Sequence, residues 1–236
     1  MTVRRLIAGS LGLDGSGSRA LRRRRFRYFL ELVDEILRTR DECRILDIGG
    51  EPAYWTAVAD LMADRRCHVT LVNIVAYPVE TEGMKSLAGD ARDLHEFPDK
   101  SFDIVHSNSV IEHVGRWQDM IAMAREVRRL APGYFVQTPY FWFPIEPHCS
   151  TAFFHWVPES VRLGMLMRKP RGIWGRAPDV DTAMRQIQSN NLLDRRMLQT
   201  LFPDAAILRE RFAGLTKSLI AIRRANGSGA ISPPPE

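Results

Sequence analysis

Two histidines and a glutamate stand where the chain could carry out proton transfer. Glu146 and His148 lie within residues 138–148, a segment that is rich in aromatic residues and whose backbone is restricted by three prolines. His113 belongs to a Glu-His pair that follows an apolar, strand-like run. An imidazole or carboxylate that is held in place can take a proton from a reacting hydroxyl. We therefore identify His148, His113 and Glu146 as the candidate catalytic residues, with His155 as a weaker candidate base.

A different group of residues could bind a ligand at the end of a buried strand. Residues 44–50, Arg-Ile-Leu-Asp-Ile-Gly-Gly, form an apolar run that ends in an acid and two glycines. This pattern is typical of a parallel strand that enters a tight turn, where the backbone can approach a ligand closely. Glu51 follows Gly50 in place of the glycines of a dinucleotide motif. Its carboxylate disfavours a diphosphate but is compatible with a cationic ligand.

Strands and helices alternate along the first 140 residues. Apolar runs predict strands at 44–50, 68–75, 84–88, 101–106 and 133–137, and helices at 19–39, 54–66 and 117–130. This alternation predicts an α/β fold with a parallel sheet that is covered on both faces. Residues 205–210 and 218–223, on either side of Gly214, predict a closing antiparallel hairpin.

The predicted elements form a single domain, residues 19–224, with one long insertion. Residues 138–200 are too long and too aromatic for a plain connection, so we expect an insertion over the carboxyl edge of the sheet, where open α/β sheets bind ligands. We expect residues 1–18, which contain several Gly and Ser, to be a flexible lead-in. Residues 225–236 are rich in Gly, Ser and Pro and predict a disordered tail.

The composition is that of an ordinary globular protein of 236 residues, with 45% hydrophobic and 26% charged residues. No apolar run approaches the roughly 20 residues that span a bilayer. Cys43, Cys67 and Cys149 are odd in number and widely spaced, which disfavours a zinc site and a secreted disulfide framework. We do not expect the first 13 residues to be a signal peptide, because glycines and a serine interrupt their apolar stretch. We expect a cytoplasmic protein.

The positive charge is concentrated near the N-terminus. Residues 1–40 contain ten arginines and four acidic residues, whereas the formal net charge of the whole chain is only +5. Arg22 to Arg25 are consecutive. This run fits the solvated start of a helix, which we favour, or a patch for phosphate, nucleic acid or anionic lipid.

The ordered series of motifs from about residue 44 to residue 223 resembles the class I S-adenosylmethionine-dependent methyltransferases that act on small molecules. Residues 45–50 resemble the first motif of that family, with Glu51 in place of a further glycine. Residues 69–74 resemble its second strand, and residues 101–114 resemble its fourth-strand motif. The resemblance implies a Rossmann-like, doubly wound sheet of seven strands, mostly parallel, with a C-terminal antiparallel hairpin and an inserted lid.

The same resemblance implies S-adenosyl-L-methionine as the cofactor. Asn73 would hold the ribose hydroxyls, where the family usually has an acidic residue, and Asp90 would bind the adenine amino group unless it only caps a helix. The backbone at Ser107 and Asn108 would face the methionine end. The cofactor-binding residues that we predict are Asp47, Gly49, Gly50, Glu51, Asn73, Ile74, Asp90, Ala91, Ser107 and Asn108.

The expected reaction is methyl transfer to a small-molecule acceptor, with a hydroxyl of a sugar, lipid or secondary metabolite as the acceptor group. Residues 160–176 mix basic and apolar side chains. They predict an amphipathic lid helix, with a peripheral membrane contact as the less favoured interpretation. Some related quinone-pathway O-methyltransferases carry Glu-x-x-Glu-His after the fourth strand and bind a divalent metal. Ser109 replaces the first of those glutamates, so we predict no metal.

Two other functions remain open. The basic N-terminal segment is compatible with a nucleic-acid methyltransferase, but the sequence lacks the Asn/Asp-Pro-Pro-aromatic motif of base-methylating members of the class. We therefore do not expect nucleic acid as a partner. The departures at Glu51, Ala53 and Asn73 are also compatible with a binding module that keeps the fold and has lost the cofactor.

Overall fold

The computed structural model describes residues 15–172 and 174–225, with side chains from Arg22 onward. The first helix, α2 (Gly15–Leu37), begins before the expected residue 19, so residues 15–18 are helical rather than part of a flexible lead-in. The rest of the expected lead-in, and the expected tail from residue 226, lie outside the described residues.

A seven-stranded sheet forms the centre of the fold, with the strand order β3-β2-β1-β4-β5-β9-β8. The first five strands pair in parallel, and β9 pairs antiparallel with both β5 and β8. This arrangement confirms the predicted α/β sheet with a C-terminal antiparallel hairpin. The strands are β1 (Cys43–Ile48), β2 (Cys67–Asn73), β3 (Met84–Ala88), β4 (Ile104–Asn108), β5 (Gly133–Pro139), β8 (Ala206–Phe212) and β9 (Leu215–Arg223).

Several predicted elements have other bounds in the structure, and two of the differences have a clear physical reason. β4 begins at Ile104 rather than at residue 101, because Ser101 closes a turn onto the Pro98 carbonyl and the Asp103 carboxylate accepts the backbone N–H of Arg44. The helix expected at 54–66 is instead two short helices, α3 (Pro52–Thr56) and α4 (Ala59–Met62). They are separated at Val58, whose non-helical backbone places its side chain in the core.

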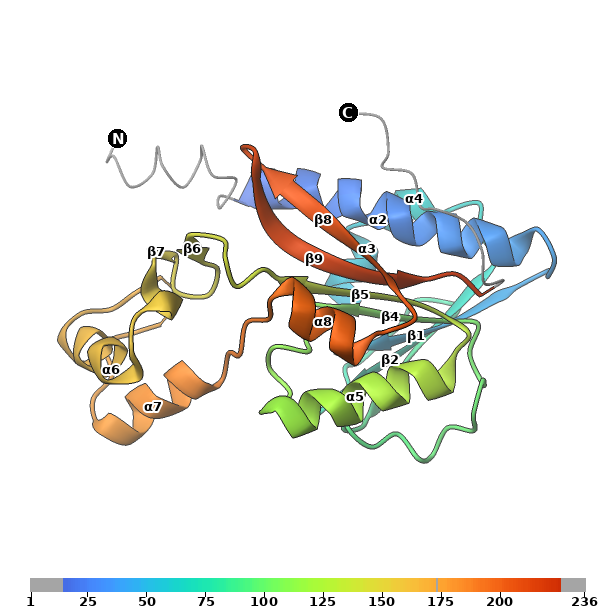
Figure 1. Ribbon diagram of the computed structural model, residues 1–236. Helices are drawn as coiled ribbons and strands as arrows, with labels where there is room; N and C mark the ends of the chain where they lie inside the picture. The colour runs from blue at the N-terminus through green and yellow to red at the C-terminus, as the bar shows by residue number, and fades with distance from the viewer. Residues whose placement is uncertain (1–14, 173, 226–236) are drawn as a thin grey trace.

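Helices cover both faces of the sheet (Figure 1). On one face, α2 and α3 pack against the sheet around Phe26, Phe29 and Trp55, with α4 alongside. On the other face lie α5 (Trp117–Leu130) and α8 (Arg195–Leu201), whose apolar residues pack with those of β4 and β5. The two apolar clusters fix the sheet between two helical layers, as expected for a doubly wound fold.

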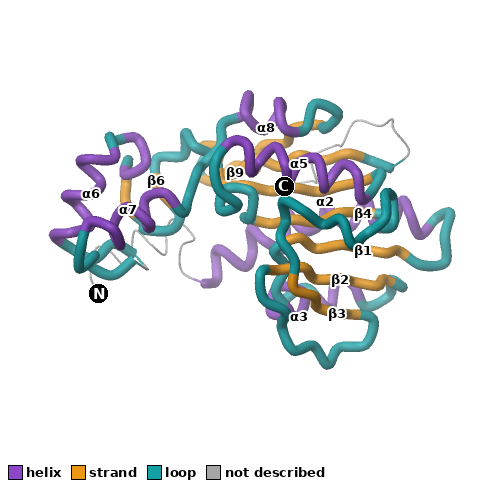
Figure 2. Tube along the Cα trace, turned by 90° about the horizontal axis from the view of Figure 1, so that it is seen from below, coloured by secondary structure: helices purple, strands orange, loops and turns teal. Residues whose placement is uncertain are grey.

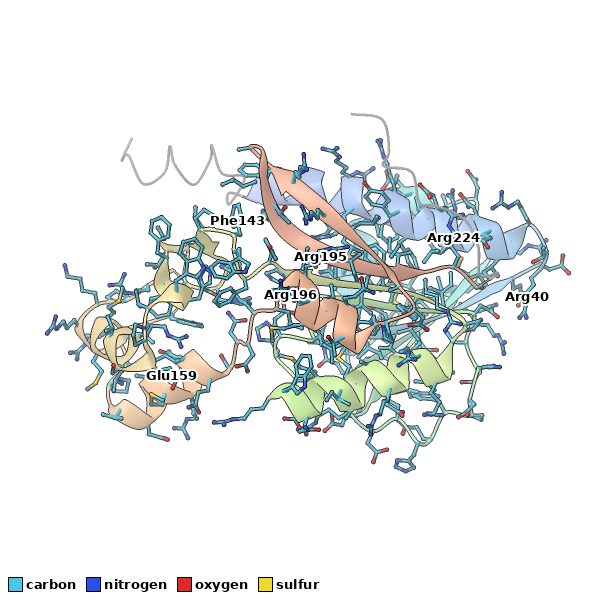
Figure 3. All side chains as sticks on the ribbon, viewed as in Figure 1. Arg40, Phe143, Glu159, Arg195, Arg196 and Arg224 are labelled. Carbon is cyan, nitrogen blue, oxygen red and sulfur yellow. The ribbon has the colours of Figure 1, made fainter. Side chains whose placement is uncertain are left out.

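The insertion forms a separate small lobe beside the sheet, at the left in Figures 1 and 2. It contains β6 (Ile145–Glu146), β7 (Thr151–Ala152), the 3-10 turn η1 (Phe154–Trp156), α6 (Glu159–Arg168) and α7 (Val180–Gln188). In Figure 3, Phe143 and Glu159 mark this lobe, whereas Arg40 and Arg224 lie at the opposite end of the molecule. The chain thus leaves the carboxyl end of β5 and returns through α8.

The insertion has its own apolar core, in which Leu166 of α6 is fully buried among residues that include Phe154 and Ile187. Leu163, Met165 and Met167 also pack against this core. The apolar residues of α6 therefore serve the interior of the lobe, which agrees with the lid interpretation of this segment. Among the described residues, none of the helices has the length and apolar character needed to cross a bilayer.

Candidate functional site

The turn after β1 depends on two glycines. Gly49 has a φ of +74°, a conformation that favours glycine, and its N–H donates to the Val72 carbonyl at 2.7 Å. A Cβ at Gly49 would overlap the Val110 side chain, and a Cβ at Gly50 would overlap the Asp47 carboxylate. The turn can therefore lie against the loop after β4 only because Gly49 lacks a side chain, and it can close over Asp47 only because Gly50 lacks one.

Asp47 is buried beneath this turn. Its Oδ2 accepts the Trp55 indole N–H at 2.7 Å, and its Oδ1 lies 2.7 Å from Nδ1 of His106. His106 is fully buried, and its Nε2 is 3.2 Å from the Tyr54 hydroxyl. Both carboxylate oxygens are thus used inside the protein. A contribution of Asp47 to ligand binding would act through this network, in which His106 has a structural role.

A cavity of about 310 Å³ opens at the carboxyl edge of the sheet, next to this turn. It brings together six of the predicted site residues. The others do not line it: Asp47, Gly50, Glu51, Ser107, Asn108, Glu146 and His148. A larger cavity, of about 570 Å³, lies near the starts of β1, β2 and β3, at the edge where such sheets do not bind their ligands. The predicted residues that line the smaller cavity are Gly49, Asn73, Ile74, Asp90, Ala91 and His113.

Two polar side chains of this cavity already have partners. Asn73 Oδ1 accepts the N–H of Ile74 at 2.8 Å, which leaves the amide NH2 to face a ligand. Asp90 accepts hydrogen bonds from the Arg92 guanidinium, which lower the pKa of its carboxyl, and Arg92 also bridges to Asp119. A ligand amino group at Asp90 would therefore share the carboxylate with Arg92.

Polar atoms near the end of β4 are available for further bonds. Ser107 Oγ and Asn108 Oδ1 are buried and have no hydrogen-bond partner among the described residues. Glu51, on the other side of the turn, accepts the Tyr77 hydroxyl at 3.2 Å. Buried polar atoms without a partner are rare in proteins, but Ser107 and Asn108 are consecutive in β4 and project to opposite faces of the sheet, so they do not mark one common site.

The predicted catalytic residues meet at the contact between the insertion and the sheet domain. His148 Nδ1 lies 2.8 Å from Glu146 Oε1, and His148 Nε2 lies 3.1 Å from His113 Nε2. His113 Nδ1 donates to the carbonyl of Ser189 at 2.7 Å. Because His113 also lines the cavity, the histidine pair adjoins the space beside the Gly49 turn.

Glu146 contacts several groups around it and holds His148 in this cluster. Its buried carboxylate accepts the Cys149 backbone N–H at 2.5 Å and the Asn190 amide at 2.5 Å. Burial by itself raises the pKa of this carboxyl, but the hydrogen bonds from His148 and Cys149 outweigh it and leave the pKa below its ordinary value. Glu146 is thus suited to remain ionised and to stabilise a proton on His148.

Glu112 is a member of the cluster that the sequence reasoning did not select. It is fully buried, and its Oε2 accepts the Thr138 hydroxyl at 3.0 Å. Burial raises the pKa of Glu112 to about 7. Its other oxygen, Oε1, has no hydrogen-bond partner among the described residues and lies 4.0 Å from His113 Nε2. The Glu-His pair after β4 was the only sequence signal for this position.

His155 lies elsewhere in the insertion. Its Nε2 donates to the Phe141 carbonyl at 2.6 Å, and its Nδ1 is buried without a partner among the described residues. Burial lowers the pKa of this imidazole. Of the four candidate bases, the structure therefore joins three in one cluster and keeps His155 as a structural residue of the lobe.

The family described as "Methyltransferase domain" matches residues 21–140, which run from α2 to the end of β5. The protein belongs to this methyltransferase family. Its sheet order, with one antiparallel strand inserted beside β5, fits the class I S-adenosylmethionine-dependent members that the motifs resemble. The methyltransferase sequence has no significant match among curated proteins.

Two solved structures share the fold of this methyltransferase over nearly its whole length. The PH0226 protein of Pyrococcus horikoshii OT3 has 17% identity and a TM-score of 0.50, and the match covers 93% of this chain and 96% of that one. The Burkholderia thailandensis 1,6-didemethyltoxoflavin-N1-methyltransferase has 14% identity and a TM-score of 0.50, with 95% and 92% covered. The latter was solved with 1,6-didemethyltoxoflavin and S-adenosylhomocysteine. At these identities, the likeness concerns the fold.

Features of the methyltransferase cavity fit S-adenosylmethionine. The turn at Gly49 and Gly50 has no side chains that would block the approach of a ligand. The Asn73 amide can donate to a ribose hydroxyl. Ser107 and Asn108, whose buried side-chain oxygens have no partner among the described residues, end the neighbouring strand but do not line this cavity. The nearby carboxylate of Glu51 is compatible with the positive charge of a sulfonium.

Proposed function

We propose that this methyltransferase transfers the methyl group of S-adenosylmethionine to a hydroxyl of a small molecule. The observation that carries the proposal is the position of His113, which lines the cavity at the Gly49 turn and also contacts His148. An acceptor beside His113 would lie between the cofactor cavity and a pair of imidazoles. This juxtaposition supports a reaction in which the acceptor must lose a proton.

In this proposal, the cavity residues hold the cofactor. The Asn73 amide binds the ribose, Asp90 shares its carboxylate between Arg92 and the adenine amino group, and the Gly49 turn lies against the ligand. When bound, S-adenosylmethionine supplies an activated methyl group on a positively charged sulfur. The protein then has to align the acceptor with that group and exclude water.

The proton of the acceptor hydroxyl passes to Nε2 of His148 in the proposed reaction. With its Nδ1–H directed at Glu146, the neutral ring of His148 has its lone pair on Nε2. The Glu146 carboxylate then stabilises the imidazolium. The acceptor oxygen would form a bond to the methyl carbon as its O–H bond breaks, and the methyl–sulfur bond would break to leave S-adenosylhomocysteine. His113, at 3.1 Å from His148, is the alternative base and positions the acceptor next to the cavity.

The surface of the insertion supports an acceptor with a ring or an apolar chain. Trp142 and Phe153 are half exposed, and both pack against the partly exposed Trp156, with ring centroids 5.9 and 5.1 Å apart. Exposed aromatic faces of this kind can stack on a sugar ring or cover an acyl chain. We propose a sugar, lipid or secondary metabolite as the acceptor, and the cytoplasm as the place of the reaction.

The alternative of a nucleic-acid substrate is less well supported. Of the arginine run, Arg23 pairs with Asp60 at 2.6 Å, and Arg25 forms a largely buried pair with Glu210 at 3.1 Å. Arg22 lies over the Tyr54 ring at 5.7 Å. These contacts attach α2 to the rest of the domain and favour a structural role for the run.

The experiment supplies deuterated-methyl S-adenosylmethionine to the protein together with a small-molecule extract, and in parallel with RNA and DNA. The expected result is a labelled methyl ether in the small-molecule fraction, detected by mass spectrometry. Label found only in nucleic acid would overturn the proposal. Label on nitrogen or carbon of a small molecule would overturn the assignment of a hydroxyl acceptor.

A further inference from the structure

The histidine pair shows an unusual convergence of hydrogen-bond acceptors. His113 Nδ1 faces the Ser189 carbonyl at 2.7 Å, and His148 Nδ1 faces the Glu146 carboxylate at 2.8 Å. The Ser189 carbonyl can only accept, so neutral His113 has its proton on Nδ1. The same holds for neutral His148 when its Nδ1–H points at Glu146, rather than Nδ1 accepting from the Asn190 amide nitrogen 2.6 Å away. The two Nε2 atoms, which lie 3.1 Å apart, then face each other as lone pairs. In that pair of tautomers the contact is repulsive unless a positive charge lies between the two nitrogens.

A third acceptor points to the same place. Glu112 Oε1 is buried, has no hydrogen-bond partner among the described residues and lies 4.0 Å from His113 Nε2. One ligand atom from each of Glu112, His113 and His148 falls within 4.8 Å of the others. The three atoms come from two different parts of the fold, since His148 belongs to the insertion and the Glu-His pair follows β4.

We propose that Glu112, His113 and His148 bind a divalent transition-metal ion. Two imidazoles and a carboxylate suit ions of the manganese-to-zinc series, whereas Mg²⁺ and Ca²⁺ favour sites made of oxygen ligands. The anchoring of each Nδ1–H by a carboxylate or a carbonyl is the usual arrangement around metal-binding histidines. The prediction of no metal counted only the ligands next to Ser109, and the structure adds His148 from 35 residues further along the chain.

The ion would have two consequences for the protein. It would tie the insertion to the sheet domain, because its ligands come from both parts. With three protein ligands it would also keep a position open for an oxygen atom beside the cavity that His113 lines. The second consequence rests on the proposed function: the acceptor hydroxyl would bind at the open position, where the ion would lower its pKa. With both Nε2 atoms bound to the ion, the hydroxyl proton would pass to water instead of to His148. Metal binding itself does not depend on the acceptor.

The test uses tag-free, chelator-treated protein and two probes, ZnCl2 in isothermal titration and CoCl2 in visible absorption. We expect one Zn²⁺ per chain, a Co²⁺ absorption band of low coordination number, and no comparable binding of MgCl2. His113→Ala, His148→Ala and Glu112→Gln should each weaken Zn²⁺ binding at least tenfold. His95→Ala is the matched control, because His95 is exposed and pairs with Asp93, and it should leave binding unchanged.

A proton shared between the two Nε2 atoms is the competing explanation of their contact. Absence of Zn²⁺ and Co²⁺ binding in the folded protein would overturn the metal site in favour of that proton. Binding that survives in both His113→Ala and His148→Ala would overturn it too, and these partly exposed positions keep the test valid if Glu112→Gln fails to fold. Zn²⁺ binding without any methyl transfer would support the site and count against the proposed function.

Discussion

Nε2 of His113 lies 3.1 Å from Nε2 of His148, although the two residues belong to different parts of the fold. His113 follows β4 and lines the cavity beside the Gly49 turn. His148 lies in the insertion, where Glu146 fixes its orientation. The contact therefore places His148 of the insertion at the carboxyl edge of the sheet, where the methyltransferase cofactor is expected to bind.

Removal of the His148 imidazole should affect turnover and spare cofactor binding. We expect His148→Ala to lower the single-turnover rate at saturating cofactor by roughly 10² to 10⁴, the usual contribution of a general base. Its affinity for S-adenosylhomocysteine should stay within about twofold, because His148 does not line the cavity. Full activity of the variant would show that His148 is not the base and would leave His113 as the candidate. Loss of cofactor binding would show that the insertion forms part of the cofactor pocket.

A side chain at Gly49 should damage the cofactor turn. Gly49→Ala forces an L-residue into a left-handed conformation, at a cost of about 1–2 kcal/mol, and its Cβ overlaps Val110. We expect a lower melting temperature and weaker binding of S-adenosylhomocysteine. Gly164→Ala is the matched control, since Gly164 lies in α6 with nothing within 4 Å of an added Cβ. That change should be neutral or stabilising. Equal behaviour of the two variants would contradict the role of the turn.

Asn73 should contribute to cofactor affinity through its amide. Asn73→Ala should weaken S-adenosylhomocysteine binding by about 1 kcal/mol for each hydrogen bond lost. Asn73→Asp should retain or improve the affinity, because a carboxylate makes stronger bonds to a ribose diol. Titration calorimetry of the three proteins is the measurement. An unchanged affinity in the alanine variant would place the ribose away from the end of β2.

The insertion should lose stability in acid because of His155. Its folded-state pKa is lowered by burial, so at pH below about 6.5 the unfolded chain binds more protons at this position than the folded protein. The free energy of unfolding should therefore fall as the pH drops through this range. His155→Gln can keep the bond to the Phe141 carbonyl without titrating and should show a smaller fall. Urea unfolding between about pH 7.5 and pH 5.5 measures both proteins, and identical slopes would count against this effect.

The sequence was sufficient for the sheet but not for the site. Apolar runs ending in glycine located β1 and β3, and Gly214, with a φ of +79°, turns the closing hairpin as expected. Such features are local, because turn chemistry and alternation are encoded in neighbouring residues. The break at Val58 was missed, since it reflects burial of one side chain against the sheet rather than a local breaker.

The candidate site depends on tertiary contacts that no spacing reveals. Asp47 was predicted to face a ligand, yet its carboxylate lies between Trp55 and His106, and the pairing of β1 with β4 is what brings His106 there. Glu112 became a candidate only when His148 was found near it. Residue type and position suggested the chemistry, while the folding of the insertion onto the loop after β4 decided which residues meet.

Titration calorimetry with S-adenosylhomocysteine, with NAD as the control nucleotide, tests the central claim most directly. The claim is that the cavity between the Gly49 turn, Asn73 and Asp90 is the cofactor site of a methyltransferase. We expect one S-adenosylhomocysteine to bind per chain, Asn73→Ala and Gly49→Ala to weaken this binding, and NAD not to bind. Binding of NAD together with no heat from S-adenosylhomocysteine or S-adenosylmethionine would contradict this claim.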